Sequence, residues 1–196
     1  MPEPKFEGQN QITVFEKLEW EGGEATITYA GPEDRQGIIE ADKGRERYRR
    51  EKYNVTKTKE ALEKENAWPL EERMADDNFI FLVLKVGDEI AGYIEIKNEP
   101  ESGGMVETET LSVLEKYFRN KFGTHLMEQG IEEAQKKFGA KAVHLWTNKN
   151  NYPASQFYEN EKFGFKKTGE ERVNEGETWA GEPSVSIGMV KHLDKE

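Results

Sequence analysis

Apolar and polar residues alternate along the first part of the chain in the way expected of β-strands. Residues 12–20 are rich in strand formers, and after a Glu- and Gly-containing turn residues 25–30 alternate again, which predicts a hairpin. The next segment is polar and charged, and Asp34 is predicted to cap a helix that continues to about Tyr53.

The same periodicities predict the remaining elements. Helices are expected over 58–66, 70–75, 123–138 and 154–159, and strands over 78–86, 90–96, 106–114, 142–146, 165–173 and 185–190. The order strand, long helix, strand with short links predicts a parallel pair between 106–114 and 142–146. The fold class is therefore α/β (α+β), with a mixed central sheet of about seven strands flanked by helices.

The strand predicted over 106–114 contains a change of apolar parity. Val106 is at an even position, whereas Leu111 and Val113 are at odd positions. A strand whose side chains alternate with period 2 accommodates this change only by inserting one residue. We therefore predict a β-bulge between about Glu107 and Thr110, which would splay the sheet and open a slot.

Length and composition indicate one globular domain. The 196 residues include ten Phe, seven Tyr and four Trp, and we expect a flexible segment over 1–9 followed by a single domain over 10–196. The absence of cysteine excludes disulfides, thiolate metal sites and a cysteine nucleophile. Only three histidines are present, so no metal is expected.

The net charge of −11 bears on partners. It disfavours nucleic acid, which needs a basic surface, and it suits cationic substrates such as amines, although solubility alone would also explain it. The sequence has neither a long apolar run nor the pattern of a signal peptide, so we expect no membrane partner and a cytoplasmic location.

Five basic residues lie in the second half of the helix predicted over 34–53: Arg45, Arg47, Arg49, Arg50 and Lys52. They could bind phosphate, or they could form a solvated face balanced by Glu46 and Glu51. The second interpretation is favoured, because mixed charges at helical spacing are typical of exposed helices.

The segment after the strand 142–146 carries a more specific pattern. Asn151, Ala154 and the pair Phe157-Tyr158 lie on one helical face, and Phe163-Gly164-Phe165 then leads into another strand. This order of elements resembles the second half of the GNAT (GCN5-related) N-acetyltransferase core. The resemblance is strongest over 106–169. It implies a splayed GNAT-like fold, acetyl-CoA as co-substrate and an amine as acceptor, and it allows a homodimer.

The resemblance also implies roles for individual residues. Asn151 would contact the pantetheine arm, or it could serve only as a helix N-cap. Tyr158 would be the general acid that protonates the leaving thiolate, or it could pack only in the core. Glu107 and Glu109 are candidates for deprotonating the amine through water. The residues expected to bind acetyl-CoA are Leu111, Ser112, Val113, Arg119, Asn120, Lys121, Gly123, Thr124 and Asn151.

The loop before the long helix departs from the family pattern. The family holds the CoA pyrophosphate with Gln/Arg-x-x-Gly-x-Gly/Ala at a helix start, where free N–H groups bind anions. Aligned on Gly123, this chain has Phe118 and Lys121 at the first two positions, so the loop is degenerate. We expect the Lys121 ammonium to compensate by pairing with the diphosphate, while Asn120 adopts the left-handed backbone conformation.

These features favour an acetyl-CoA-dependent N-acetyltransferase that acts directly on a primary amine, and we expect a small cationic amine such as a polyamine. The acceptor would lie near Tyr53, Trp68 and Trp179. Two alternatives stay open. A non-catalytic GNAT-like module with weak or lost CoA binding would act through protein contacts, and an unrelated α/β binding domain would make the resemblance a matter of chance.

Overall fold

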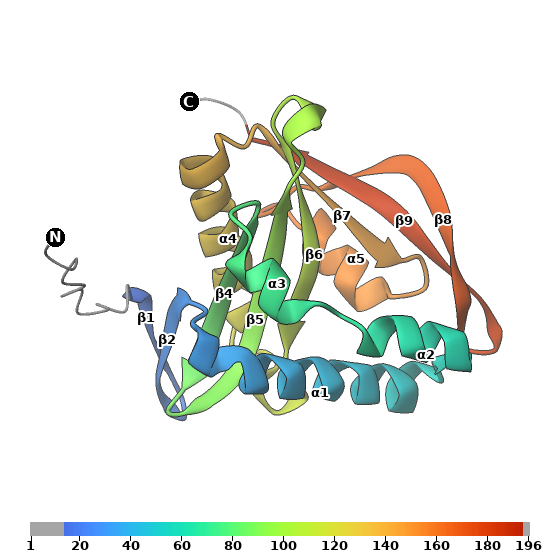
Figure 1. The fold of residues 1–196 in the computed structure, drawn as a ribbon, viewed down its shortest axis with the longest axis horizontal. Coiled ribbons are helices and arrows are strands. Elements are labelled where there is room, and N and C mark those ends of the chain that lie inside the picture. The colour runs from blue at the N-terminus through green and yellow to red at the C-terminus, as the bar shows by residue number, and fades with distance from the viewer. Residues whose placement is uncertain (1–13, 194–196) are drawn as a thin grey trace, which may run out of the picture.

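A nine-stranded sheet with helices on both faces forms the framework of the protein (Figure 1). The computed structural model describes residues 14–193; the predicted flexible segment 1–9 and the start of the first predicted strand lie outside the described residues. The strands are β1 Val14–Trp20, β2 Gly23–Tyr29, β3 Thr56–Lys57, β4 Phe79–Val86, β5 Glu89–Asn98, β6 Met105–Val113, β7 Ala142–Asn148, β8 Lys166–Trp179 and β9 Glu182–His192. The helices are α1 Arg35–Tyr53, α2 Lys59–Asn66, α3 Leu70–Ala75, α4 Phe122–Phe138 and α5 Tyr152–Glu159.

The strand order is β1-β2-β4-β5-β6-β7-β9-β8-β3. β6 and β7 run parallel, as predicted, and the other neighbours pair antiparallel. The predicted α+β class is confirmed, but about seven strands was too few for the nine in the described chain. β3 has only two residues, which is too short to show a periodicity in the sequence. It is a strand only because it pairs with β8.

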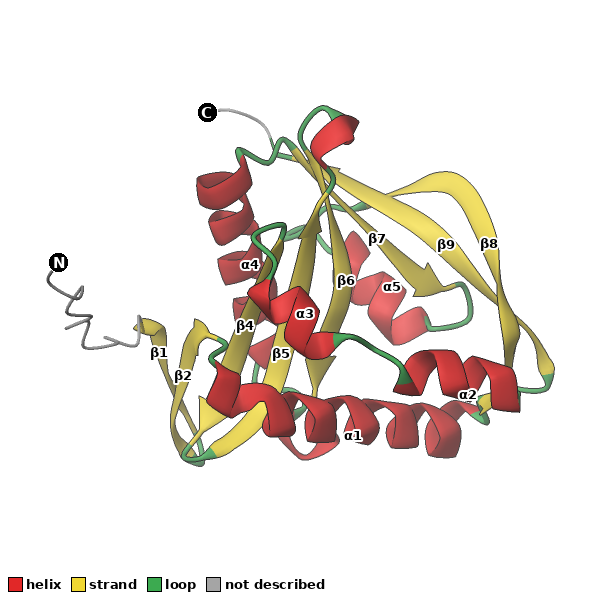
Figure 2. Ribbon diagram, viewed as in Figure 1, coloured by secondary structure: helices red, strands yellow, loops and turns green. Residues whose placement is uncertain are grey.

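Each face of the sheet has its own apolar core. On one face α4 packs through Leu126 and Met127 onto Ile94 and Ile96 of β5, and all four side chains are buried. On the other face α1 and α3 cover Phe81, Val83 and Tyr93 (Figure 2). The two faces therefore present different residues of the same strands, as the period-2 alternation requires.

The predicted β-bulge is present in β6. Glu95 of β5 lies opposite Thr110, and the next residue, Ile96, lies opposite Thr108, so Glu109 is the inserted residue. The insertion restores parity: Thr108 and Leu111 both lie opposite the isoleucines that face α4. The change of apolar parity thus located the bulge correctly.

The bulge also marks the point where the sheet splays. β6 and β7 pair only from Met105–Thr108 to the segment 142–145, whereas β7 continues alongside β9 as far as Asn148. Beyond Thr108, no described strand pairs with the β7-facing edge of β6. The predicted slot therefore lies between the carboxyl-terminal halves of these two strands.

Two local predictions need correction. Asp34 does not cap α1 with its side chain; its carboxylate accepts a hydrogen bond from the Gly31 N–H at 3.0 Å and pairs with Lys85 at 2.6 Å. The last two strands extend well beyond 165–173 and 185–190, because β8 and β9 continue into a hairpin that turns at Ala180 and Gly181, both with positive φ. In residues 14–193, no helix combines the length and apolar character needed to cross a lipid bilayer.

Candidate active site

A cavity of about 750 Å³ occupies the splay between β6 and β7. The start of α4 and helix α5 line it from one face of the sheet, and α1 with the β8–β9 hairpin lines it from the other. The predicted site residues that line it are Glu109, Leu111, Val113, Arg119, Lys121, Gly123, Thr124, Asn151 and Tyr158. Residues distant in sequence are thus gathered at one opening that passes through the sheet.

Three predicted site residues do not belong to this lining. Ser112 is buried on the other side of β6, opposite Tyr93. The Asn120 amide donates to the Tyr117 carbonyl at 3.2 Å. Glu107 precedes the bulge and is half-buried, and burial together with the neighbouring Glu109 raises the pKa of its carboxyl. Glu109 is therefore the better placed of the two predicted acids.

Helix α5 holds Tyr158 at the cavity. The helix starts at Asn151, whose side chain accepts a hydrogen bond from the Ala154 N–H at 3.4 Å, so its N-cap role is present while it also lines the cavity. The Tyr158 ring packs edge-on against Phe157 and Phe165, with centroids 5.2 and 5.7 Å away. Core packing and a catalytic role thus coexist on one side chain.

The Tyr158 hydroxyl is suited to donate a proton. It makes no hydrogen bond to any residue in the part of the chain that the structure describes. Burial raises the pKa of the phenol to about 12, against an opposing effect of the Arg45 guanidinium. The group therefore stays protonated at neutral pH and has its hydrogen available to a bound ligand.

The loop before α4 differs in detail from the expectation. Lys121 itself adopts the left-handed conformation (φ 61°, ψ 10°) and Arg119 does the same (φ 68°), whereas Asn120 is not in this region. The prediction that Asn120 supplies this backbone angle is therefore wrong: Arg119 and Lys121 on either side adopt it, and the Asn120 amide donates to the Tyr117 and Phe118 carbonyls. No side chain within residues 14–193 caps α4, so the N–H groups at its start are available beside the cavity.

Two substitutions at Lys121 separate backbone strain from charge. Lys121→Gly should raise stability by about 1 kcal/mol, because a left-handed non-glycine residue costs roughly 1–2 kcal/mol. In Lys121→Asn, the asparagine can adopt the same left-handed conformation, and the positive charge is removed. If the ammonium pairs with the diphosphate, calorimetry should show both variants binding acetyl-CoA about 5- to 100-fold more weakly.

The matched control for these variants is Lys116→Gln, which removes a charge from the same loop outside the cavity lining, where Lys116 pairs with Glu89. It should leave acetyl-CoA binding unchanged. Tighter binding by Lys121→Gly would instead show that the Lys121 side chain crowds the ligand.

A buried carboxylate that the sequence analysis missed lies next to the cavity residue Glu109. Glu95 of β5 is 1% exposed and pairs with Arg73 of α3 at 2.7 Å. The same guanidinium lies 3.5 Å from the bulge residue Glu109. The sequence did contain a signal, because Glu95 lies in the otherwise apolar run 90–96. An acidic side chain in a strand that is buried on both faces needs a charged or hydrogen-bonding partner.

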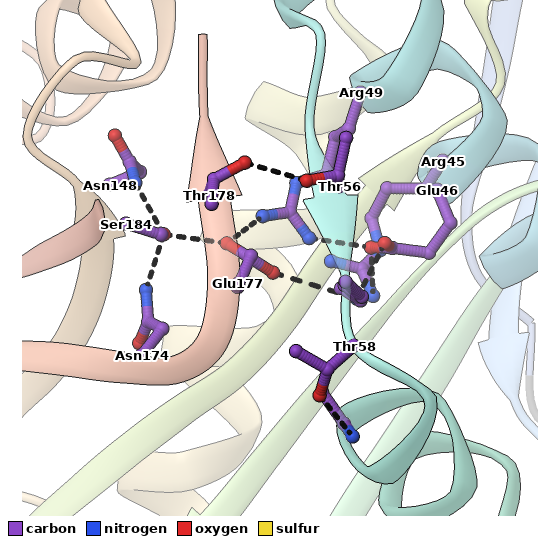
Figure 3. A network of polar contacts seen from close by, with 12 residues as sticks. Arg45, Glu46, Arg49, Thr56, Thr58, Asn148, Asn174, Glu177, Thr178 and Ser184 are labelled. Atoms are coloured by element: carbon purple, nitrogen blue, oxygen red, sulfur yellow. Dashed lines mark hydrogen bonds and ion pairs between the residues drawn. The ribbon is translucent and has the colours of Figure 1, made fainter. Parts of the chain in front are cut away.

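The wall opposite α5 is formed by a buried ion network (Figure 3). Glu46 of α1 pairs with Arg49 at 2.7 Å and Lys57 at 2.7 Å, and Arg49 also pairs with Glu177 of β8 at 2.9 Å. Burial opposes ionisation of Glu46, but Arg45, Arg49 and Lys57 together lower its pKa to about 2. The network ties α1 to the β8–β9 hairpin across the cavity.

This network corrects the interpretation of the basic residues on α1. Arg47, Arg50 and Lys52 are exposed, as a solvated face requires, but Arg45 and Arg49 line the cavity and Glu46 is buried. Positions 42, 45, 46 and 49 share one helical face at i, i+3 and i+4 spacing, and this face turns inward.

Aromatic and amide side chains complete this wall. Tyr53 stacks on Trp179 with centroids 4.6 Å apart, and both line the cavity as expected for the acceptor region; Trp68 does not line it. Figure 3 shows Ser184 between the Asn148 and Asn174 amides, each donating to its hydroxyl at 2.8 Å. The wall can therefore offer ring faces, amides and charged groups to a ligand.

The fold and the cavity define an α+β protein whose sheet opens beside an uncapped helix start. The sequence profile described as "Acetyltransferase (GNAT) family" matches residues 43–165, which is more than half of the chain. The chain belongs to this family.

Individual relatives support the assignment at different distances. The chain is 29% identical over 105 residues to a protein named N-alpha-acetyltransferase from Saccharolobus solfataricus; the alignment spans 49% of this chain and 62% of that relative, so less than two thirds of its length. A Bacillus anthracis protein crystallised with acetyl coenzyme A is 26% identical, with a TM-score of 0.53 over 63% of this chain and 68% of that one. The PaiA N-acetyltransferase of Thermoplasma acidophilum, crystallised with coenzyme A, shares the fold at 19% identity, with a TM-score of 0.65 over 86% and 99% of the two chains.

The cavity lining offers the groups that coenzyme A requires. A pyrophosphate needs N–H donors and cations, and the start of α4 with Arg119 and Lys121 offers both. A pantetheine arm needs strand-like backbone partners, and the edge of β6 beyond Thr108 is not paired with β7. The residues present therefore fit the group. Within residues 14–193, no cluster of three or more His, Asp and Glu side chains is arranged to hold a metal ion.

Proposed function

We propose that the protein is an acetyl-CoA-dependent N-acetyltransferase that transfers acetyl to a primary amine within a ternary complex. The observation that carries the proposal is that one cavity is lined both by the protonated Tyr158 hydroxyl, which no described residue engages, and by Glu109 at the bulge. A proton donor and a proton acceptor in one cavity are what aminolysis of a thioester requires.

Each residue has a role that follows from its position. Acetyl-CoA, when bound, supplies an acetyl group activated as a thioester. Tyr158 donates its proton to the leaving sulfur, and Glu109 accepts a proton from the amine through water. The backbone N–H of Leu111, beside the bulge, holds the thioester oxygen. The sequence contains no cysteine to form an acyl-enzyme, so the amine attacks directly.

For the acceptor we propose a small cationic amine such as a polyamine. The net charge of −11 supports this choice, as does the bulge, where Glu95 and Glu109 share the single guanidinium of Arg73. Arg172, which lies over the Trp146 ring on the other wall, adds a cation. Because a relative is named N-alpha-acetyltransferase, the α-amine of a polypeptide is the second candidate acceptor. A cytoplasmic location, the lack of nucleic-acid and metal partners, and a homodimer remain predictions from the sequence.

The proposal is tested by measuring ligand binding and turnover on the same preparation. Millimolar acetyl-CoA should raise the melting temperature, since a ligand at 100 times its Kd adds about 2.7 kcal/mol to stability. Thiol release should then follow the addition of spermidine, an aminoglycoside, amino acids or a peptide with a free amino terminus. Spermidine should react fastest, and its rate should fall with salt.

The outcomes separate the alternatives. Stabilisation without thiol release from any acceptor would favour a non-catalytic module that binds CoA. A complete lack of stabilisation by acetyl-CoA and by CoA would favour a module that has lost CoA binding. Preference for an anionic acceptor would overturn the cationic assignment while leaving acetyl transfer intact.

A further inference from the structure

Glu95 is a charged residue in an apolar environment. It lies in the centre of β5 between Ile94 and Ile96, both fully buried, and is itself 1% exposed. A buried carboxylate must be paired or protonated, because desolvation strongly disfavours its ionised form. The partners of Glu95 therefore decide its charge.

The main partner of Glu95 is shared with the cavity. One guanidinium nitrogen of Arg73 lies 2.7 Å from the Glu95 carboxylate, and another lies 3.5 Å from the Glu109 carboxylate. The planar guanidinium can serve two carboxylates at once and is itself positioned 4.6 Å over the Phe79 ring. Glu95 lies opposite Thr110 in the ladder, so the bridge spans the bulge itself.

The other charged groups near Glu95 do not remove this competition. Asp42 and Arg45 of α1 approach from the neighbouring helix, but Arg45 is bound to Asp42 at 2.7 Å, and Tyr93 donates to the same Asp42 carboxylate at 2.8 Å. Burial raises the pKa of Glu95 to about 7; Arg73 opposes the shift, and Glu109 and Asp42 add to it. Glu95 thus changes charge near neutral pH.

We propose that Glu95 and Arg73 form a positioning pair that sets the orientation of Glu109. The assignment of Glu109 as the proton acceptor rests on the proposed function; the coupling of the three groups does not. When Glu95 is neutral, the Arg73 guanidinium is engaged mainly by Glu109. When Glu95 is ionised, the guanidinium is divided between two carboxylates, and Glu109 is held less tightly.

The charge on Glu95 has a cost in stability. Its pKa in the folded protein is about 7, above the ordinary value of 4.5. The stabilising contribution is therefore complete below pH 4.5 and is lost as the pH rises to about 7. Glu95→Gln should melt at about the same temperature as the wild type at pH 4.5 and at a higher temperature at pH 8. A purely structural ion pair would give the opposite result at pH 8.

The coupling is tested directly by ¹³C NMR titration of the glutamate carboxyl groups in the full-length protein. The wild type should contain one carboxyl that titrates near pH 7 and is absent from Glu95→Gln. The midpoint of this Glu95 carboxyl should fall in Glu109→Gln, because the Glu109 charge then no longer repels it or competes for Arg73. Glu99→Gln is the matched control: Glu99 pairs with Lys97 outside the cavity lining and should leave this midpoint unchanged. An unchanged Glu95 midpoint in Glu109→Gln would overturn the proposal.

A second measurement connects the pair to turnover, with spermidine and acetyl-CoA as probes. The wild-type kcat/KM should rise through pH 7, and Glu95→Gln should lose this inflection while its KM for acetyl-CoA stays the same. An active Glu95→Gln enzyme with an unchanged pH profile would refute the positioning role. If the wild type releases no thiol while the NMR coupling is present, the proposed function fails and the coupled pair stands.

Discussion

Replacing Tyr158 with phenylalanine is expected to lower kcat by about 100-fold or more, since a positioned general acid typically contributes that much. The ring would keep its packing against Phe157 and Phe165, so the fold and acetyl-CoA binding should change little. Only the hydroxyl, which no described residue engages, is removed. Steady-state thiol release with spermidine measures the loss, and calorimetry with acetyl-CoA measures binding.

The control is Tyr152→Phe, which removes a hydroxyl from the first turn of the same helix. Tyr152 is 67% exposed and is not part of the cavity lining, so this variant should retain wild-type kcat. If Tyr158→Phe raises KM without lowering kcat, the hydroxyl positions a substrate and does not act as the acid. An unaltered kcat and KM would leave Tyr158 with its packing role alone.

Deletion of Glu109 is expected to have the largest effect on acetyl-CoA binding. Removing the inserted residue leaves a regular ladder in which Thr108 and Leu111 still lie opposite the isoleucines that face α4, so the core is kept. The β-bulge that bends β6 away from β7 is lost, and the slot between the two strands should narrow. Loss of the hydrogen bonds to the pantetheine arm, at about 0.5–1.5 kcal/mol each, should weaken acetyl-CoA binding by roughly 10- to 100-fold.

The matched variant is Glu109→Ala, which keeps the number of residues and removes only the carboxylate. Calorimetry should show near-normal acetyl-CoA binding for Glu109→Ala and much weaker binding for the deletion, while circular dichroism shows both variants folded. Glu109→Ala should lose activity although it binds acetyl-CoA. A deletion variant that binds acetyl-CoA as tightly as the wild type would mean that the slot does not depend on the bulge.

Periodicity and parity located the features that depend on neighbours in sequence. The bulge followed from the positions of Val106 and Leu111, and the start of α5 followed from Asn151, because strand alternation and helix capping act over a few residues. The strand β3 was beyond this reasoning, since two residues have no period and only β8 makes them a strand.

The site was predicted less completely, because its charges are brought together from distant segments. Arg73 connects Glu95 with Glu109, and Arg49 pairs with Glu177. Neither contact can be predicted from the spacing of these residues in the sequence. The inward face of α1 was misinterpreted for the same reason. Glu46 was expected to balance charges on an exposed helix face, whereas it is buried and pairs with Arg49 and Lys57. Sequence reasoning found the elements of the cavity and left its electrostatics to the tertiary structure.

The outer edge of β8 has a consequence for self-association. β3 covers this edge only at Glu177 and Thr178, so most of this 14-residue strand has no paired strand on that side among the described residues. An open edge invites another strand, but Gly169 and Gly176 adopt positive φ and the pairing with β9 shifts register twice. Charged side chains also occur along the strand: Lys166, Lys167, Glu170, Glu171, Arg172 and Glu175. Such an irregular, charged border resists edge-to-edge addition, so two copies of this protein should associate through a different surface and resist growth into extended sheets.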